Sequence, residues 1–371
     1  MAPRRSNGAG AFPKAVESPA PEKKTDPDSL YAALDLGTNS CRMLIAQPDG
    51  SQFQVIDSFS KSVGLGQGLG GSGRLSRSSM ARTVQALKIC KRKLTKHEVS
   101  HMRLVATEAC RRASNARDFM AYIERETGLK LEIIKPEEEA TLAVISCAPL
   151  VGKRTEQLLV VDIGGGSTEL VWLDLSHVAP AERQAAIMSL RGGVRKDPMP
   201  GPAARVVDWI SVPLGVATLR EQFDDVADDS ARFALMSWFF EEQLGDFSPF
   251  HREPNRDGFQ IIGTSGTVTT VAATHLGLKR YDRNKVDGLQ MTSDQIDKVI
   301  RGYLAAGPEG RRRDPRIGKD RQALIMSGAA ILQALLRVWP TDRLSVADRG
   351  LREGLLYAQM SSDGVLDEDE G

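Results

Sequence analysis

Two segments of the chain place an aspartate, a glycine turn and a serine at the same spacing. Residues 35–40 read Asp-Leu-Gly-Thr-Asn-Ser and residues 162–167 read Asp-Ile-Gly-Gly-Gly-Ser, so Asp, Gly and Ser are identical in register. Backbone N–H groups in a tight glycine turn can point into one concavity and bind an anion, and the serine hydroxyl adds a donor. A carboxylate at the end of the preceding strand can hold Mg²⁺ beside the phosphate oxygens. The repeated pattern therefore favours phosphate binding assisted by a metal ion.

These two turns supply most of the candidate site residues. The residues predicted to contact phosphate are Gly37, Thr38, Asn39, Ser40, Gly164, Gly165, Gly166 and Ser167, and the predicted metal ligands are Asp35 and Asp162.

One such turn alone would be weak evidence, because glycine turns also close ordinary hairpins. Two copies that face each other across a cleft could hold a polyphosphate from both sides, and a duplication also accounts for the length of the chain. A Walker A loop is disfavoured, because Gly152-Lys153 and Gly318-Lys319 are not followed by Ser or Thr. No strand leads into a G-x-G-x-x-G segment, so a dinucleotide enzyme has no support.

Three adjacent carboxylates, Glu137, Glu138 and Glu139, follow Pro136 at the predicted start of a helix. Hydrolysis of a phosphoanhydride needs a carboxylate that orients and deprotonates water. Acidic residues are also favoured at a helix N-terminus by the helix dipole, whatever the chemistry. The residues alone do not choose among the three.

Glu169 lies on the strand that leaves the second turn, and the apolar residues 170–172 after it indicate that this strand is buried. A buried carboxylate is costly without a nearby cation, so we assign Glu169 to metal binding or to positioning water. Arg42, after the first turn, and Arg111, after a predicted strand at 102–106, are candidates for two-pronged contact with phosphate oxygens.

Composition sets broad limits on class and partners. At 371 residues the chain is long enough for two domains, and its formal net charge of +1 names no partner. Its four cysteines contain no C-x-x-C pair and its five histidines show no metal-ligand spacing, so zinc and disulfide readings lack support. Residues 1–29 lack the apolar run of a signal peptide or membrane span. We therefore expect a cytoplasmic protein with no membrane and no nucleic-acid partner.

The apolar pattern predicts order from Tyr31 onward. Expected elements are strands at 31–36, 41–46, 53–58, 102–106 and 158–163, and helices at 76–96, 115–127 and 136–147. Glycines crowd residues 64–73, which we expect to form a mobile loop. The termini, 1–29 and the acidic segment 363–371, are expected to be disordered or solvated tails.

Around the two glycine turns, the sequence closely resembles the exopolyphosphatase and guanosine pentaphosphate phosphohydrolase family, which is part of the superfamily of actin, hexokinase and the chaperone ATPases. The resemblance spans roughly residues 31–361, and its most specific elements are residues 34–42 and 161–170. Weaker elements follow in the expected order at residues 106–113, 136–140, 211–215 and 348–357.

The resemblance implies an α/β fold of two ribonuclease-H-like domains, with the active site in the cleft between them. Domain I would comprise residues 30–135 and the closing helix 350–362, and domain II residues 136–349. The resemblance also selects Glu139 as the general base and implies Mg²⁺ as the cofactor. Inorganic polyphosphate or guanosine pentaphosphate would be the substrate, and a homodimer is a family-level expectation.

Two rival functions stay open at this point. A sugar-kinase-type phosphotransferase of the same superfamily is disfavoured by the helix that carries Glu139 and by Ser265, which stands where relatives often have glycine. A non-catalytic sensor of polyphosphate or guanosine pentaphosphate is disfavoured by the intact carboxylates. Residues 179–207 are interpreted as an inserted surface loop. A basic run could guide a polyanion, although an exposed loop is the preferred interpretation; it comprises Arg311, Arg312, Arg313, Arg316, Lys319 and Arg321.

Overall fold

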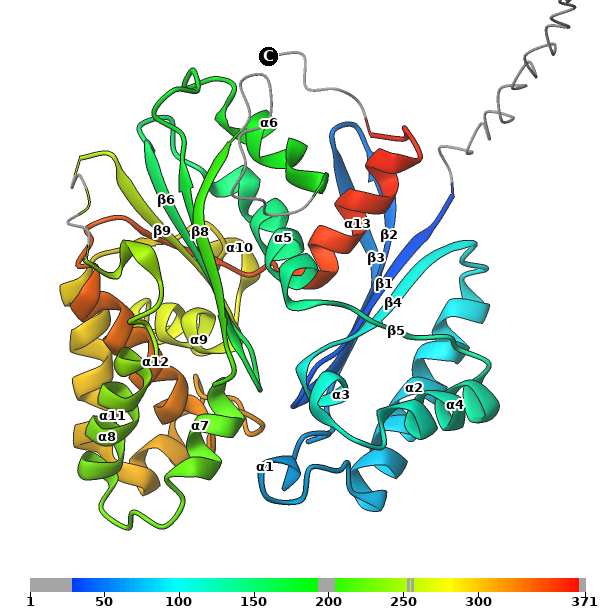
Figure 1. Cartoon of the computed structure of the whole chain (residues 1–371), viewed down its shortest axis with the longest axis horizontal. Coiled ribbons are helices and arrows are strands. Elements are labelled where there is room, and N and C mark those ends of the chain that lie inside the picture. Colours follow the sequence, from blue (N-terminus) through cyan, green and yellow to red (C-terminus); the bar gives the residue numbers. More distant parts are fainter. Residues whose placement is uncertain (1–28, 193–203, 252–253, 255–256, 367–371) are drawn as a thin grey trace, which may run out of the picture.

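The computed structural model describes residues 29–192, 204–251, 254 and 257–366. Two β-sheets stand beside each other, and helices cover the faces of each (Figure 1). Most of both predicted tails, and residues 193–203 of the predicted insertion, lie outside the described residues. Among the helices of the described part, none is long and apolar enough to cross a membrane.

The first sheet has five strands in the order β3-β2-β1-β4-β5. Its central strand, β1, is antiparallel to β2 and parallel to β4, and it is a short apolar run because both of its faces are covered. The strands are β1 (Tyr31–Leu36), β2 (Ser40–Asp49), β3 (Gln52–Ser62), β4 (His101–Ala106) and β5 (Glu132–Ile133). The helices of this half are α1 (Leu69–Ser72), α2 (Arg77–Lys96), α3 (Glu108–Arg112) and α4 (Ala116–Thr127).

The second sheet has six strands in the order β10-β11-β9-β6-β7-β8. Its strand β6 is antiparallel to β7 and parallel to β9, which is the relation that β1 has to β2 and β4. The strands are β6 (Gln157–Ile163), β7 (Thr168–Asp174), β8 (Arg205–Val212), β9 (Phe259–Thr264), β10 (Gln290–Met291) and β11 (Leu344–Ala347). The predicted duplication of the hairpin is therefore seen in the sheet topology as well.

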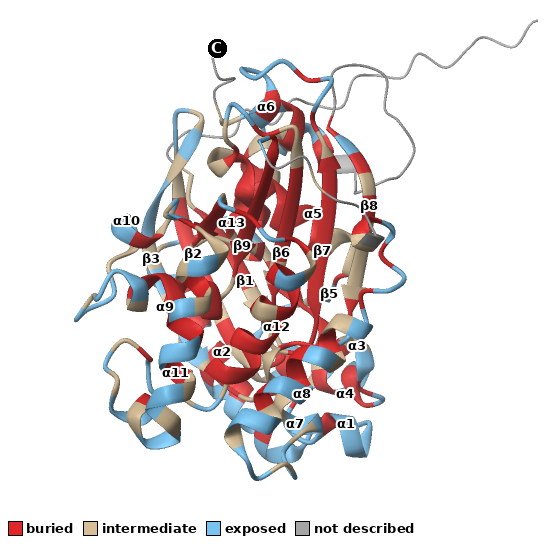
Figure 2. Ribbon diagram, turned by 90° about the vertical axis from the view of Figure 1, so that its left-hand side faces the viewer, coloured by how far each residue is buried: buried red, intermediate tan, exposed pale blue. Residues whose placement is uncertain are grey.

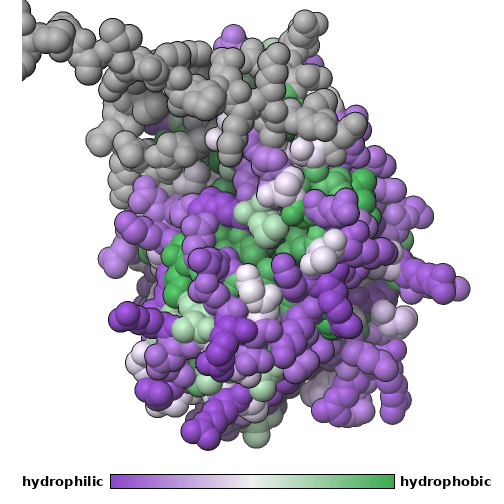
Figure 3. All heavy atoms as spheres, turned by 90° about the vertical axis from the view of Figure 1, so that its right-hand side faces the viewer, coloured by the Kyte–Doolittle hydropathy of each residue, from purple (hydrophilic) through white to green (hydrophobic). Residues whose placement is uncertain are grey.

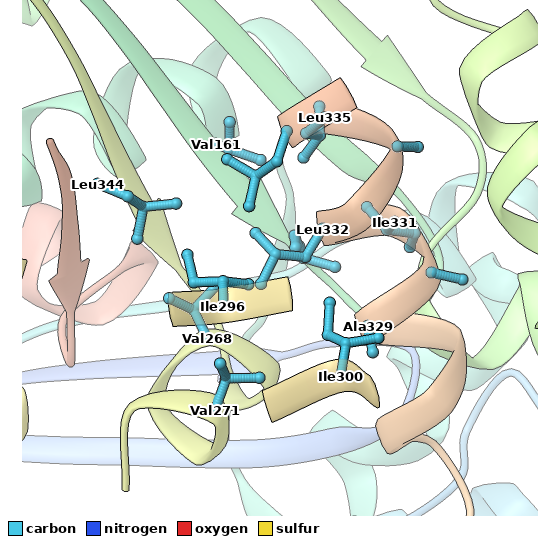
Figure 4. Packing of buried hydrophobic residues seen from close by; sticks show 14 of the residues in the cluster. Val161, Val268, Val271, Ile296, Ile300, Ala329, Ile331, Leu332, Leu335 and Leu344 are labelled. Carbon is cyan, nitrogen blue, oxygen red and sulfur yellow. The ribbon is translucent and has the colours of Figure 1, made fainter. Parts of the chain in front are cut away.

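Helices pack on both faces of the second sheet. One face is covered by α8 (Asp229–Glu242), α9 (Gly266–His275), α11 (Ser293–Arg313) and α12 (Ile325–Val338), with α7 (Val216–Gln222) and α10 (Arg283–Val286) at its margins. Figure 4 shows how apolar side chains of α9, α11 and α12 meet Val161 of β6 and Leu344 of β11. Figure 2 shows the inner strands β9, β6 and β7 of this sheet buried, whereas the helices have exposed outer surfaces. The core thus fixes β6, whose end carries the second turn.

Two helices occupy the space between the sheets. α5 (Pro136–Cys147) packs mainly on the second sheet, whereas α13 (Leu351–Ser362) packs on the first (Figure 1). The two helices also touch each other, and Gly354 of α13 is required there because a Cβ would collide with the carbonyl oxygen of Leu142. The fold is the actin-like two-domain α/β fold that the sequence predicted.

Three local expectations need correction. The glycine-rich segment 64–73 contains helix α1, and Gly64 and Gly66 donate N–H groups to the first turn, so it is not an open loop throughout. The predicted surface loop 179–207 contains α6 (Arg183–Met188), whose Ala186 and Ile187 are buried, and the start of β8. The basic run is not one exposed loop either, because Arg311 is buried inside α11 and Arg321 lines the central cleft. In all three segments the structure is determined by buried apolar side chains or by contacts with residues distant in the sequence.

The cysteines and the end of the chain complete the description. All four cysteines are buried and free. Asp363, expected in a solvated tail, accepts a hydrogen bond of 2.9 Å from the hydroxyl of Tyr31 and lies 3.3 Å from His101 Nδ1. The end of α13 is therefore tied to the first residues of β1 and β4.

Candidate active site

The first turn joins β1 to β2, and it is held from outside by the glycine-rich segment. Gly37 N–H closes the turn by donating to the carbonyl of Ser40 at 2.9 Å. Residues 63–66 donate backbone N–H groups to the carbonyls of Thr38 and Asn39 at 2.8–2.9 Å. In a planar trans peptide the next N–H points away from the carbonyl, so the N–H of Asn39 points away from that segment.

The second turn joins β6 to β7 and repeats this construction with a different support. Gly164 N–H donates to the carbonyl of Ser167 at 3.0 Å, and the N-terminus of α7 donates to the carbonyls of Gly164 and Gly165 at 2.9 and 2.8 Å. The N–H groups of Gly165 and Gly166 therefore point to the opposite side. Within the described chain neither group has a backbone partner. Two donors are thus free to bind an anion.

The two turns touch each other across the gap between the sheets. A Cβ at Gly165 would lie 3.1 Å from the backbone nitrogen of Asn39, and one at Gly166 would lie 3.1 Å from Cβ of Thr38. A side chain at either glycine would therefore push the two halves apart. Glycine is required here by the approach of the halves as well as by access of a phosphate to the backbone.

A cavity of about 290 Å³ lies at this junction. Most of the predicted site residues line it: Asp35, Gly37, Thr38, Asn39, Ser40, Arg42, Glu139, Asp162, Gly164, Gly165, Gly166 and Ser167. Glu169 and Arg111 do not line it and stand behind it.

Glu139 stands in the first turn of α5 and is the glutamate of its triplet that lines the cavity. Glu138 instead points to Arg103, with which it forms an ion pair, and Glu137 is half-buried without lining the cleft. Burial and the neighbouring Glu169 carboxylate raise the pKa of Glu139 to about 8, although Arg111 opposes the shift. Of the three glutamates, Glu139 is therefore the one that the fold places at the cavity, and its role as general base stays a prediction.

Arg111 holds Glu139 in place. Its guanidinium donates to Glu139 Oε2 at 2.7 Å, to the carbonyl of Ile134 at 3.0 Å and to Glu108 Oε2 at 3.1 Å. These contacts take up much of its hydrogen-bonding capacity. The predicted contact of Arg111 with phosphate stays a prediction, and its visible contacts are with the candidate base.

The residue opposite each aspartate differs between the hairpins. Asp35 of β1 pairs with Arg42 of β2, and Asp162 of β6 pairs with Glu169 of β7. Glu169 is buried, and Ser211 donates its hydroxyl to Oε1 at 2.8 Å. Burial and the charge of Asp162 raise the pKa of Glu169 to about 7.

The two aspartates are also desolvated. Burial raises the pKa of Asp162 to about 8, reinforced by the charges of Glu139 and Asp35. Burial also raises the pKa of Asp35, and the charge of Arg42 partly offsets that shift. Several carboxylates that repel one another in a buried place form a region that favours cations.

Comparisons with known proteins place this site in a family. The model of the Ppx/GppA phosphatase family matches residues 44–363. The chain belongs to that family. Two solved structures of the Aquifex aeolicus Ppx/GppA protein are 30% and 31% identical, with TM-scores of 0.70 and 0.68. These alignments cover 90% and 89% of this chain and 98% and 99% of the Aquifex chains.

A more distant structure supports the fold of this Ppx/GppA member. An exopolyphosphatase from Cytophaga hutchinsonii is 22% identical, and the alignment covers 91% of this chain and all of that one with a TM-score of 0.74. The family identifies the protein as a phosphatase, so phosphate-bearing compounds are the substrates to consider.

The residues of this Ppx/GppA protein fit Mg²⁺ only if substrate phosphates and waters complete its coordination. Among the described residues, no group of three His, Cys, Asp or Glu side chains lies close enough together to hold a metal ion. Mg²⁺ is commonly bound through one or two carboxylates, substrate phosphates and several waters rather than by a complete protein cage. The half-buried carboxylates of Asp35 and Asp162, which both line the cavity, are compatible with that mode.

Sequence reasoning missed three cations of the cleft. Arg321, Arg349 and Arg352 all line it, and Arg349 forms an ion pair of 2.6 Å with Asp287. Arg321 donates to the carbonyl of Gly266 at 2.9 Å and to Thr270 Oγ1 at 2.7 Å. The guanidinium of Arg352 instead lies 3.8 Å from Glu353 Oε1. Arg352 stood inside a family motif, and that motif was the available signal.

Proposed function

We propose that this chain is a cytoplasmic, Mg²⁺-dependent phosphohydrolase that releases the terminal phosphate of inorganic polyphosphate, of guanosine pentaphosphate, or of both. The observation that carries the proposal is the pair of turns whose free N–H groups face a cleft lined by Glu139. Anion donors on two sides, with a carboxylate beside them, are what in-line attack of water on a terminal phosphoryl group requires. Membership of a phosphatase family supports the reaction class.

In this proposal the terminal phosphate rests on the N–H groups of Asn39, Gly165 and Gly166. Arg42 and Arg352 offset its negative charge from the same cleft. Glu139 accepts the proton of a water molecule as the oxygen of that water bonds to phosphorus and the bridging P–O bond breaks.

The surroundings of Glu139 suit a general base. Its raised pKa, about 8, makes the carboxylate more basic than an exposed one, and the Arg111 contact fixes its direction. A base works best when its pKa lies near the working pH. Glu169 would position water or a metal-bound group from behind the second turn.

Asp35, Asp162 and Glu169 are the residues that would hold Mg²⁺, directly or through water. When bound, the ion would offset charge on the phosphate oxygens and on the leaving chain. The mutual repulsion of these buried carboxylates supports the assignment, because a divalent cation would relieve it.

The deciding experiment measures phosphate release from long polyphosphate, tripolyphosphate and guanosine pentaphosphate side by side, with Mg²⁺ and with a chelator. The proposal expects release from at least one substrate, abolished by the chelator. Transfer from ATP to a sugar, with no release from these three, would favour a phosphotransferase. Tight binding with neither reaction would favour a sensor.

A further inference from the structure

A second cavity, of about 430 Å³, lies among the helices on the outer face of the second half. It is enclosed by parts of α7, α8, α11 and α12, which lie together below the second sheet in Figure 1. Its walls are unusually rich in cations for a chain whose formal net charge is only +1. The cationic side chains are Arg220, Arg232, Arg311, Arg312 and Lys319, and the carboxylate among the lining residues is Asp229.

That carboxylate does not neutralise the other charges. Asp229 accepts two hydrogen bonds from Arg311, at 2.8 and 2.9 Å, and Arg311 is itself buried and donates to the carbonyl of Tyr303. The buried Arg311–Asp229 ion pair therefore forms part of the cavity wall. Arg232 donates to the backbone carbonyls of Val226 and Ala227, so its charge faces no carboxylate there.

A kink in α11 shapes the rim of the basic cavity. Gly307 has φ 63° and is followed by Pro308, which lines the cavity and cannot donate a helical N–H. The turn after the kink carries Arg312, and the following loop carries Lys319. Both side chains are exposed. Arg312 pairs with the equally exposed Glu309 at 2.5 Å, a surface contact that water screens and that a polyanion can replace.

Adjoining cavities connect this place to the active-site cleft. Arg220 and Ala323 line both the basic cavity and an intermediate cavity of about 570 Å³. The intermediate cavity reaches Thr38 of the first turn and shares Asp320 and Leu324 with the cleft. Its lining also includes carboxylates, so the positive charge is concentrated at the far end rather than along the whole path.

We propose that the basic cavity binds a distal run of phosphates of a polyphosphate chain whose terminal phosphate lies in the cleft. The assignment of that chain end to the cleft rests on the proposed function. Several guanidinium and ammonium groups lining one cavity match the repeating charge of polyphosphate, and only a chain that crosses the intermediate cavity would reach both sites.

The test removes two accessible charges without touching the Arg311–Asp229 pair. Arg312→Gln/Lys319→Gln is compared with Lys298→Gln/Arg301→Gln, which removes the same charge from the exposed face of α11 before the kink. Equilibrium binding of fluorescent long polyphosphate and of tripolyphosphate is measured on each full-length protein. Thermal melting checks folding, and Lys319→Gln alone is the milder second variant.

We expect the cavity variant to bind long polyphosphate about tenfold more weakly, since each accessible charge pair is worth a factor of a few. Tripolyphosphate binding should be unchanged in every variant, and the control should bind both ligands normally. Unchanged long-chain binding would overturn the proposal, as would an equal loss in the control or an equal loss for tripolyphosphate. If the wild type binds long polyphosphate but releases no phosphate, the proposed function fails, while the binding comparison still decides the cavity.

Discussion

The two hairpins share a backbone and differ in the side chain that faces each aspartate. Both turns are closed by the same glycine-to-serine hydrogen bond, at 2.9 and 3.0 Å, and both carry an aspartate one strand position from the end. Opposite that aspartate the first hairpin has Arg42 and the second has Glu169. A duplicated backbone therefore offers one cation and one carboxylate at equivalent places.

The surroundings of the two side chains match this difference. Among the described residues no hydrogen bond holds the Arg42 guanidinium, and burial together with the charge of Arg352 lowers its pKa. Glu169 is bound by Ser211 and hidden from the cleft. Both turns thus present N–H groups at the cleft, while the first hairpin adds the cation Arg42 and the second keeps the carboxylate Glu169 behind the cavity.

The largest effect should come from the residue that belongs to neither hairpin. Glu139→Gln should lower kcat by about 10²- to 10⁴-fold, because the base is lost while both turns keep their donors. Glu138→Gln, which removes one of the two carboxylate partners of Arg103 and does not touch the cavity, is the matched control. Steady-state phosphate release and equilibrium binding should show lost turnover with retained affinity. Near-normal turnover in Glu139→Gln would mean that a hairpin carboxylate is the base.

Arg42→Gln should act chiefly on substrate binding, raising KM or Kd by about 10- to 100-fold, since a hydrogen bond to a charged group is worth about 1.5–3 kcal/mol. Arg42→Lys should recover part of the loss by keeping the charge without the planar fork. Arg112→Gln, at a more exposed position on α3, serves as the control. A normal affinity in Arg42→Gln would remove the contrast between the hairpins.

Glu169→Gln should change the response to metal instead. We expect the Mg²⁺ concentration for half-maximal rate to rise about tenfold, the lower end for residues that orient metal ligands. Ser211→Ala removes the hydroxyl that binds Glu169 and should shift the titration in the same direction by less. The check is a Mg²⁺ titration of the rate at saturating substrate; coincident curves for wild type and Glu169→Gln would exclude the assigned role.

The sequence revealed the parts of this site that are local in the chain. An aspartate at the end of an apolar strand and a glycine turn are visible within a few residues, so both turns and most strands were predicted closely. Glu139 needed either the resemblance or the fold, because the helix dipole favours all three glutamates equally. Arg321, Arg349 and Arg352 were missed as cleft residues, because only the folded chain brings such distant segments together.

Burial of charged groups was the second property that the sequence did not show. Arg311 belongs to a basic run that looks solvated, yet Asp229, 82 residues away, pairs with it inside the second half. The glycine-rich segment looks flexible, yet the first turn accepts its N–H groups. Sequence patterns register the cost of burying polar groups, but not the distant partner that offsets it.

The smallest effect concerns the outer strands of the two sheets, β3 and β8, each of which carries an aspartate. On β8, Asp208 accepts from the backbone N–H groups of Trp209 and Ser248. On β3, Asp57 binds Lys93 of α2 at 2.7 Å and His97 at 3.1 Å. In the first half, an ion pair between Asp57 and Lys93 thus fastens the outer strand to a helix.

The Asp57 contact makes part of the stability depend on pH. The hydrogen bond from Lys93 is the main cause that holds the pKa of Asp57 below its usual value, opposed in part by burial. A depressed carboxyl pKa stabilises the fold above the unfolded pKa, about 3.9, and the contribution disappears as pH falls through the folded pKa. Because the pair is near the surface, it contributes about 0.2–1 kcal/mol to the free energy of unfolding.

Asp57→Asn should therefore lower Tm by about 1–3 °C at pH 7 and by much less below pH 3. Asp49→Asn, at an exposed position, should leave Tm unchanged at both pH values. Calorimetric melts of the three proteins across that range measure the difference. A Tm deficit that persists at the acid end would show that Asp57 acts through packing rather than through charge.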